Sequence, residues 1–285
     1  MAETRAARRQ GRHEARTRND GVFGGRGLLY VYAGLVYLFL FLPIIIVVIA
    51  SLTTDGRTSF PPSGFTFDWY QELAKDDDLI DAFQTSLLIA VMAAAIASTL
   101  GLLAAYGLSR YAFRLKRGAQ ALFYLPMLVP GVVSGISLVI WFNRIDLDTG
   151  FVTILIAHAV HALPYTLTLI LTSFYGFDRR LEEAAQDLGA NEWRTFRRVT
   201  LPLVLPGVIG GALIAFTLSF DEFVLTFFVA GGGVNTLPLE IYSRIRFLLS
   251  PVINSAAAVV ILVSITLILG GQVLAAMRRG ERAAA

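Results

Sequence analysis

Cysteine is absent from this chain of 285 residues, which excludes disulfides and Cys-based metal sites. Cysteine usage therefore gives no information about the redox compartment. Charged residues are also scarce: they make up 16% of the sequence, whereas soluble domains carry about 25%. The hydrophobic share is 55% and the mean hydropathy is +0.64. These values exclude an ordinary soluble domain and indicate a membrane protein.

Six apolar segments are long enough to cross a membrane, since a helix needs about 20 apolar residues to span about 30 Å of hydrocarbon. The strands of an outer-membrane barrel would be only about 10 residues long, so helices are favoured. A basic tail at 1–27 precedes a six-helix domain at 28–285. We therefore expect an all-α membrane protein with transmembrane helices at about 28–50, 84–108, 120–142, 152–175, 203–230 and 252–277.

Lysine and arginine near membrane helices are retained on the cytoplasmic side. Of the 24 basic residues, 19 fall in the N-terminal tail, in the loops after the second and fourth expected helices, and at the C-terminus. The pattern predicts a multi-pass protein of the bacterial cytoplasmic (inner) membrane with both termini inside. The basic tail also suits nucleic acid or anionic lipid. Its place before a membrane helix is a sufficient reason for the charge, so we expect contact with membrane lipid and no nucleic-acid partner.

A polar segment separates the fourth and fifth expected helices on the same side. Asp178 precedes an acidic first turn, as expected where a short helix begins. Gly189 stands where that helix would end in a left-handed residue, and a second short helix would follow it. Trp193, Phe196 and Val199 would then pack on the bundle. The sequence predicts a helix, a turn and a helix lying at the membrane surface.

The spacing within this segment is specific: Glu183-Ala184-Ala185 is followed after three residues by Gly189 and after nine more by Val199-Thr200-Leu201-Pro202. An ordinary amphipathic connector would explain a lone Glu-Ala-Ala but not the full pattern. The pattern resembles the EAA signature of permease subunits of ATP-binding-cassette importers. The resemblance implies the type I importer permease fold and a coupling loop at about 178–202 that docks in a groove of a cytoplasmic ATPase. It implies these coupling residues: Glu182, Glu183, Ala184, Ala185, Asp187, Gly189, Ala190, Leu201 and Pro202.

Further short motifs occur along the chain, among them Phe67-Asp68-Trp69-Tyr70, Ser219-Phe220-Asp221-Glu222-Phe223, Thr236-Leu237-Pro238 and Pro251-Val252-Ile253-Asn254-Ser255-Ala256. Together they resemble the spermidine and putrescine permease subfamily, and most closely the second permease subunit of that system. Two departures exist: the subfamily commonly has two Asp at Asp221-Glu222, and Gly131 stands where an acidic residue often follows the proline. The solute could therefore instead be an opine, an aminoalkylphosphonate, ferric iron or thiamine.

Asp221 and Glu222 lie in the outward third of the expected helix at 203–230. Burying a carboxylate in a membrane costs free energy, so such residues are functional candidates by default. Adjacent helical residues point about 100° apart, so one carboxylate would line a pathway while the other pairs with Arg244, Arg246 or another subunit. A helix-end pair in external water, or a structural salt bridge, is the competing interpretation. Aromatic faces near an amine would add cation–π contacts. The predicted substrate path comprises Asp221, Glu222, Phe220, Phe223 and Trp141.

Other polar residues carry weaker signals. His158 and His161 share one helix face, but no third ligand lies in that segment, so interhelical hydrogen bonds are favoured over a metal site. Asp76 to Asp78 in the first external loop would suit a cation or a basic patch of a partner, although a solvated turn is the simpler interpretation.

No GxxxxGK[ST], HExxH or GxSxG motif is present, so we expect neither an ATP site nor catalytic residues in this chain. A six-helix membrane enzyme or channel is the alternative class. The resemblance implies a second homologous permease subunit, two ATPase subunits and an extracytoplasmic substrate-binding protein as partners. ATP and Mg would then bind to the ATPase subunits, and this chain would bind no cofactor.

Overall fold

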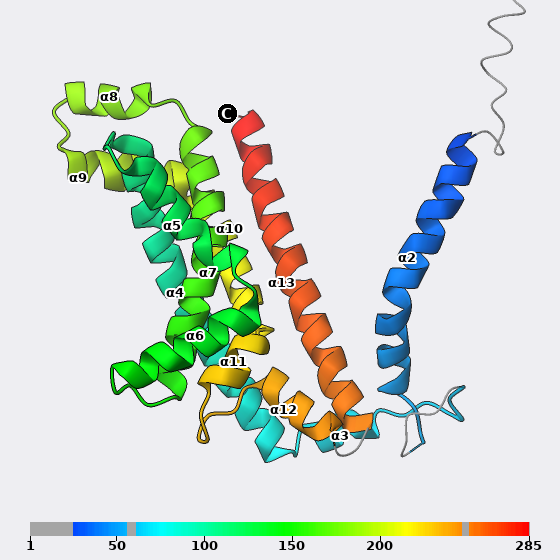
Figure 1. Cartoon of the computed structure of the whole chain (residues 1–285). Helices are drawn as coiled ribbons and strands as arrows, with labels where there is room; N and C mark the ends of the chain where they lie inside the picture. Colours follow the sequence, from blue (N-terminus) through cyan, green and yellow to red (C-terminus); the bar gives the residue numbers. More distant parts are fainter. Residues whose placement is uncertain (1–24, 56–60, 247–250, 285) are drawn as a thin grey trace, which may run out of the picture.

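The computed structural model describes residues 25–55, 61–246 and 251–284, and within them it is almost entirely helical (Figure 1). Most of the basic tail, up to residue 24, lies outside the described residues. Within the described residues, Thr53 and Phe65 form an isolated antiparallel β-bridge. The helices are α2 Gly25–Ala50, α3 Asp68–Leu73, α4 Asp77–Arg110, α5 Lys116–Leu128, α6 Gly131–Arg144, α7 Phe151–Tyr175, α8 Arg180–Asp187, α9 Glu192–Thr195, the π-helix η1 Phe196–Thr200, α10 Leu201–Phe220, α11 Val224–Val229, α12 Leu237–Ile245 and α13 Pro251–Ala284.

Four stretches of the described residues are long and apolar enough to span a membrane: α2, α4, α7, and the run through α9, η1 and α10. The third expected span, 120–142, is not one helix, because α5 and α6 meet at an angle of 107°. Pro130 explains the break. A proline disfavours the helical region for the residue before it, and Val129 is extended at φ −87° and ψ 128°.

The fifth expected span, 203–230, is also interrupted. Helix α10 ends at Phe220 and α11 begins at Val224, so Asp221 and Glu222 lie at a break between two helices. The Glu222 carboxylate accepts a hydrogen bond from the Leu225 N–H at 2.9 Å, which satisfies a donor at the start of α11. The expectation that both carboxylates lie within a continuous helix was wrong for this reason.

Helices α4, α7 and α10 form the centre of the bundle. Small residues on the buried face of α4 allow a close approach: a Cβ added at Gly101 would stand 2.6 Å from Thr166 Oγ1 on α7. The same hydroxyl donates to the Ala97 carbonyl at 3.0 Å. Packing of this kind is how membrane helices associate when lipid removes the hydrophobic driving force between them.

The remaining elements lie at the two ends and along one side of this centre (Figure 1). The start of α2, the pair α8 and α9, and the last turn of α13 lie at one end, and α3 and α12 lie at the other. Helix α4 runs between these two ends. Helix α2 stands apart from the central helices, and most of its apolar side chains are exposed in the isolated chain.

We expect Gly101→Ala to destabilise the protein by about 1–3 kcal/mol, because the added methyl group overpacks the contact with Thr166. Gly107→Ala is the matched control on the same helix, since no atom lies within 4 Å of its added Cβ. Thermal unfolding of both variants in detergent measures the difference. Equal melting temperatures would contradict close α4–α7 packing at Gly101.

Candidate functional site

The polar segment between α7 and α10 folds as the expected helix, turn and helix. The Asp178 side chain accepts a hydrogen bond from the Arg180 N–H at 3.0 Å as α8 begins. Gly189 ends this helix at φ +88°, in the left-handed region that favours glycine. Asn191 then caps α9 by accepting from the Arg194 N–H at 2.9 Å. Local sequence signals therefore determine the shape of this loop.

A π-helical turn, η1, joins α9 to α10 and was not expected from the sequence. Pro202 has no N–H for the carbonyl four residues earlier, and the helix widens immediately before it. Leu201 and Pro202 occupy the first two positions of α10, as expected for residues at the start of a membrane helix. The turn places Thr200 against α8.

An exposed face on this loop carries apolar side chains. Leu181 is 50% exposed, Leu188 is 90% exposed and Trp193 is 66% exposed. Trp193 stacks on Phe196 with ring centroids 5.9 Å apart, but most of its surface stays uncovered, so its expected packing on the bundle is only partial. The other expected coupling residues are Glu183, Ala184, Ala185, Asp187 and Ala190, all at least partly exposed on the same loop.

Glu182 differs from its neighbours because it is buried, with 7% of its surface exposed. Its carboxylate lies 2.7 Å from Arg110 Nε and accepts a hydrogen bond from the Thr200 hydroxyl. The Arg110 guanidinium also lies over the rings of Phe174 and Phe177, at 5.2 and 5.0 Å from their centroids. In this conformation Glu182 is therefore occupied within its own chain, and its expected role in coupling stays a prediction. We call Arg110, Glu182 and Thr200 the inner joint.

The break between α10 and α11 gives its two carboxylates different surroundings. Asp221 is exposed, and its carboxylate has no hydrogen bond or ion pair within the described residues. Glu222 binds the Leu225 N–H and lies 3.9 Å from His161 Nε2. Of the partners expected for the second carboxylate, Arg244 binds Asp76 and Glu240 instead, and pairing with another subunit stays a prediction. The accessible acid at the break is Asp221.

Buried hydrogen bonds hold α11 against α7. His158 bonds to the Ser219 hydroxyl through Nδ1 at 2.8 Å and to the Thr226 hydroxyl through Nε2 at 2.9 Å. The Thr153 hydroxyl donates to the Val229 carbonyl at 2.8 Å, at the other end of α11. The prediction of interhelical hydrogen bonding by His158 is confirmed. Within the described residues, no group of three His, Cys, Asp or Glu side chains is arranged to hold a metal ion.

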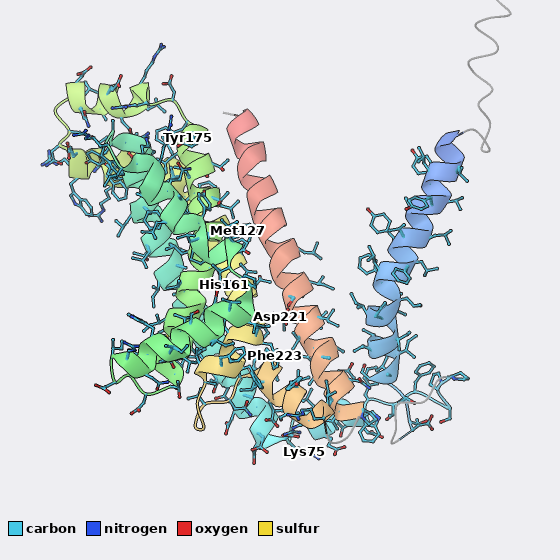
Figure 2. All side chains as sticks on the ribbon, viewed as in Figure 1. Lys75, Met127, His161, Tyr175, Asp221 and Phe223 are labelled. Atoms are coloured by element: carbon cyan, nitrogen blue, oxygen red, sulfur yellow. The ribbon has the colours of Figure 1, made fainter. Side chains whose placement is uncertain are left out.

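A cavity of about 310 Å³ lies beside this break, at the bend between α5 and α6. Its lining is mostly apolar, with Ser134, Ser137 and His161 as polar members. In the view of Figure 2, Met127, His161, Asp221 and Phe223 follow one another along the side of the bundle that faces α13. His161 lines the cavity and lies 3.9 Å from Glu222, the neighbour of Asp221, so the cavity is close to the break.

The expected aromatic partners of this region are distributed differently. The Phe223 ring packs on Tyr242 of α12, with centroids 4.6 Å apart. Trp141 is exposed on α6. Phe220 is buried between Phe83 and Phe216, so its ring belongs to the core and does not line a pathway in this conformation.

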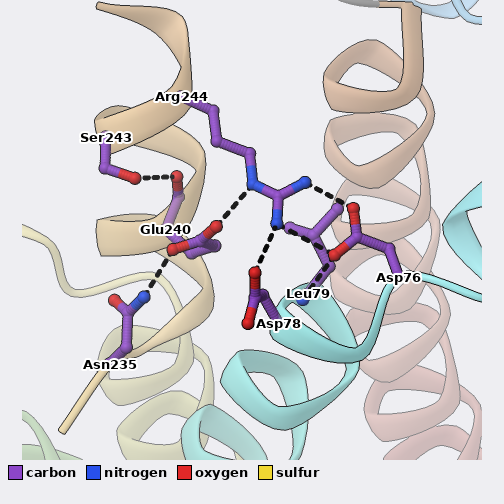
Figure 3. Close-up of polar contacts among 7 residues, drawn as sticks. All are labelled: Asp76, Asp78, Leu79, Asn235, Glu240, Ser243 and Arg244. Carbon is purple, nitrogen blue, oxygen red and sulfur yellow. Dashed lines mark hydrogen bonds and ion pairs between the residues drawn. The ribbon is translucent and has the colours of Figure 1, made fainter.

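Arg244 at the opposite end of the molecule binds several carboxylates (Figure 3). Its guanidinium donates to Asp76 and to Glu240 and lies 3.7 Å from Asp78. Hydrogen bonds from this guanidinium hold the pKa of Asp76 below its usual 3.8. The ion pair is thus present at neutral pH, and its contribution to stability disappears only as the pH falls through that lowered pKa. We call Asp76, Glu240 and Arg244 the outer joint.

The outer joint corrects the interpretation of Asp76 to Asp78 as a solvated turn at one residue, Asp76. Asp76 is occupied by an arginine of its own chain, 168 residues away in sequence. Asp78 stays largely exposed and lines a hollow of about 520 Å³ together with Asp81 and Glu240. Sequence reasoning missed the joint because no local pattern relates Asp76 to Arg244.

Comparison with known proteins gives one family and several relatives. The family described as binding-protein-dependent transport system inner membrane component matches residues 97–279. The spermidine/putrescine transport system permease protein PotC of Haemophilus influenzae is 38% identical over 239 residues, which cover 84% of this chain and 93% of that protein. The putrescine transport system permease protein PotI of Escherichia coli K12 is 36% identical over 232 residues, covering 79% of this chain and 82% of that protein.

A solved structure shares the fold. It is a bacterial ABC transporter involved in the import of the acidic polysaccharide alginate, with a TM-score of 0.68 at 18% identity. The match covers 90% of this chain and 96% of that one. The expected type I importer permease fold is confirmed.

We expect His158→Leu to lower stability by about 2 kcal/mol, because the hydroxyls of Ser219 and Thr226 lose their buried partner. His161→Leu is the matched control one helical turn away, since its contact with Glu222 is longer and more exposed. Thermal unfolding in detergent compares the two. A larger loss in the control would contradict the assigned role of His158.

Proposed function

The chain belongs to the family of binding-protein-dependent transport system inner membrane components, and we propose that it is a permease subunit of an ATP-driven importer for polyamines such as spermidine and putrescine. The observation that carries the proposal is the 36–38% identity to polyamine permease proteins over most of the chain. The loop at α8 and α9 and the free Asp221 carboxylate supply the parts that such a subunit needs. A membrane enzyme or channel would leave both features unexplained.

We place the end with α8 and α9 in the cytoplasm. Of the 24 basic residues, 19 lie in the tail, loops and terminus expected there, and these parts of the described chain gather at one end of the fold (Figure 1). Basic residues near membrane helices are retained on that side. Under this assignment α3 and α12 face outward, toward an extracytoplasmic binding protein.

The exposed face of the loop is the surface that would dock in an ATPase subunit. Leu181, Leu188 and Trp193 give it apolar area, and Glu183 adds charge at its edge. Apolar residues ringed by polar ones mark interaction sites on otherwise polar surfaces. A second, similar permease and two ATPase subunits would complete the complex, and ATP and Mg would bind to the ATPase subunits.

Asp221 is the residue that would meet the solute. Its carboxylate is accessible and unpaired within the described residues, and it lies at a helix break beside a mostly apolar cavity. A polyamine alternates ammonium groups with methylene chains, which suits a carboxylate next to an apolar wall. Charge attraction strengthens as the surroundings lose water. Glu222 has a separate task, since it caps α11.

Transport by such a subunit requires access to alternate between the two sides. ATP binding inside and binding-protein docking outside would bias the same two-state bundle. The α5–α6 bend and the α10–α11 break are the interrupted parts of that bundle, and they lie beside the proposed solute position.

We expect Asp221→Asn to lower spermidine uptake about tenfold while assembly of the complex stays near normal, because one ion pair with the solute is lost. Asp221→Glu is the matched control that keeps the charge. Uptake of radiolabelled spermidine by proteoliposomes containing the complex measures the effect, with size-exclusion chromatography as the assembly readout.

Competition in the same assay tests the solute class. Unlabelled putrescine and spermidine should compete, whereas an opine, 2-aminoethylphosphonate, ferric iron and thiamine should not. If no polyamine competes, the polyamine part of the proposal is wrong and the permease part stands.

We expect Gly189→Val to uncouple ATP hydrolysis from uptake. A β-branched residue at φ +88° is strained by at least about 1–2 kcal/mol, so the α8–α9 turn would change shape. Gly189→Asn is the control, because asparagine tolerates this region. The ratio of solute imported to ATP hydrolysed should fall for valine and hold for asparagine. An unchanged ratio in the valine variant would contradict the proposed docking role of the loop.

A further inference from the structure

Helix α4 is continuous where other spanning segments are broken. It runs for 34 residues from Asp77 to Arg110, about 51 Å at 1.5 Å per residue. By contrast, α5 and α6 meet at 107°, and the helical structure is interrupted between α10 and α11. The buried face of α4 packs along α7 and α10 over its length. Among the described spans that pack in the centre of the bundle, α4 is the longest uninterrupted helix.

The inner joint attaches the last turn of α4 to the coupling loop. Arg110 is the last residue of α4, and its ion pair reaches Glu182 in the first turn of α8. Thr200 of η1 donates to the same carboxylate. The Tyr106 ring of α4 also packs on Phe196 of η1, with centroids 5.3 Å apart. Movement of α8 would therefore be transmitted directly to this end of α4.

The outer joint attaches the first turn of α4 to α12. Asp76 caps α4 by accepting from the Leu79 N–H at 3.1 Å, and the same side chain binds Arg244 (Figure 3). The Leu237 N–H at the start of α12 donates to the Ser86 hydroxyl at 2.8 Å. A guanidinium that donates through several nitrogens fixes orientation as well as distance.

We propose that α4 is a rigid strut that transmits conformational change between the coupling loop and the outer α12 segment, with Arg110, Glu182, Asp76 and Arg244 as its positioning residues. The inference rests on the proposed function, in which the inner end meets an ATPase and the outer end meets a binding protein. Coupling between two such faces is reciprocal in free energy. A helix attached at both ends by arginine–carboxylate contacts supplies a physical route for this coupling.

The first test measures how strongly the solute-loaded binding protein stimulates ATP hydrolysis by the reconstituted complex. Arg110→Gln and Asp76→Asn should each reduce that stimulation at least fivefold. Arg114→Gln and Asp77→Asn are matched controls, since they remove nearby exposed charges outside both joints and should leave stimulation within twofold. Glu182→Gln serves as a second inner variant if Arg110→Gln fails to assemble, because glutamine keeps an acceptor for Thr200.

The double variant Arg110→Gln with Asp76→Asn separates a strut from two independent contacts. If α4 transmits the change, breaking either joint already interrupts it, so the double variant should be no worse than the more severe single variant. Losses that multiply would mean that each joint only holds its own segment, which overturns the strut.

A distance measurement tests rigidity directly. The chain has no native cysteine, so spin labels can be attached at Asp77→Cys and Gly107→Cys alone. The label separation should stay constant, to within about 2 Å, between nucleotide-free and ATP-bound states, because a helix keeps its rise of 1.5 Å per residue. A larger change would overturn the strut. Absence of any stimulation in the unmodified complex would instead overturn the proposed function, and the inference with it.

Discussion

Every backbone N–H and C=O group inside hydrocarbon needs a hydrogen-bond partner, and this requirement governs where the bundle can be interrupted. The α10–α11 break meets it with side chains. Glu222 accepts from the Leu225 N–H, and the Thr226 hydroxyl donates to the Glu222 carbonyl. His158 then fixes Thr226 against α7. An irregular stretch is tolerated at this depth because neighbouring side chains close it, and the same stretch leaves Asp221 accessible.

Internal pairing divides the charged residues of the fold into two groups. One group forms ion pairs that hold helices in place: Arg110 with Glu182, and Arg244 with Asp76. Asp221 and the exposed side chains of the α8–α9 loop remain available to other molecules. In a chain with 16% charged residues, a carboxylate without an internal partner is the more informative signal of function.

Sequence reasoning succeeded where the determining interactions are local. Apolar length predicted α2, α4 and α7, and Gly189 with its neighbours predicted the turn between α8 and α9. It failed at 203–230 because no proline or glycine marks the break and the acidic pair Asp221-Glu222 was assigned to the interior of one helix, although Pro130 was a usable signal at the other break. It also missed the burial of Glu182, whose partner Arg110 lies on a different helix. Contacts between residues far apart in sequence leave no periodic trace, so the two joints required the structure.

The contact between the first and last long helices has a consequence for biosynthesis. The Ser255 hydroxyl near the start of α13 donates to the Ser51 carbonyl just after α2, 204 residues earlier in the chain. Helix α2 is synthesised well before α13 and has few other contacts within the described chain. It must therefore wait for this neighbour while the residues between Ser51 and Ser255 are translated, and the contact forms only after the start of α13 has been made. Early release of the nascent chain would leave α2 without the neighbour that positions it.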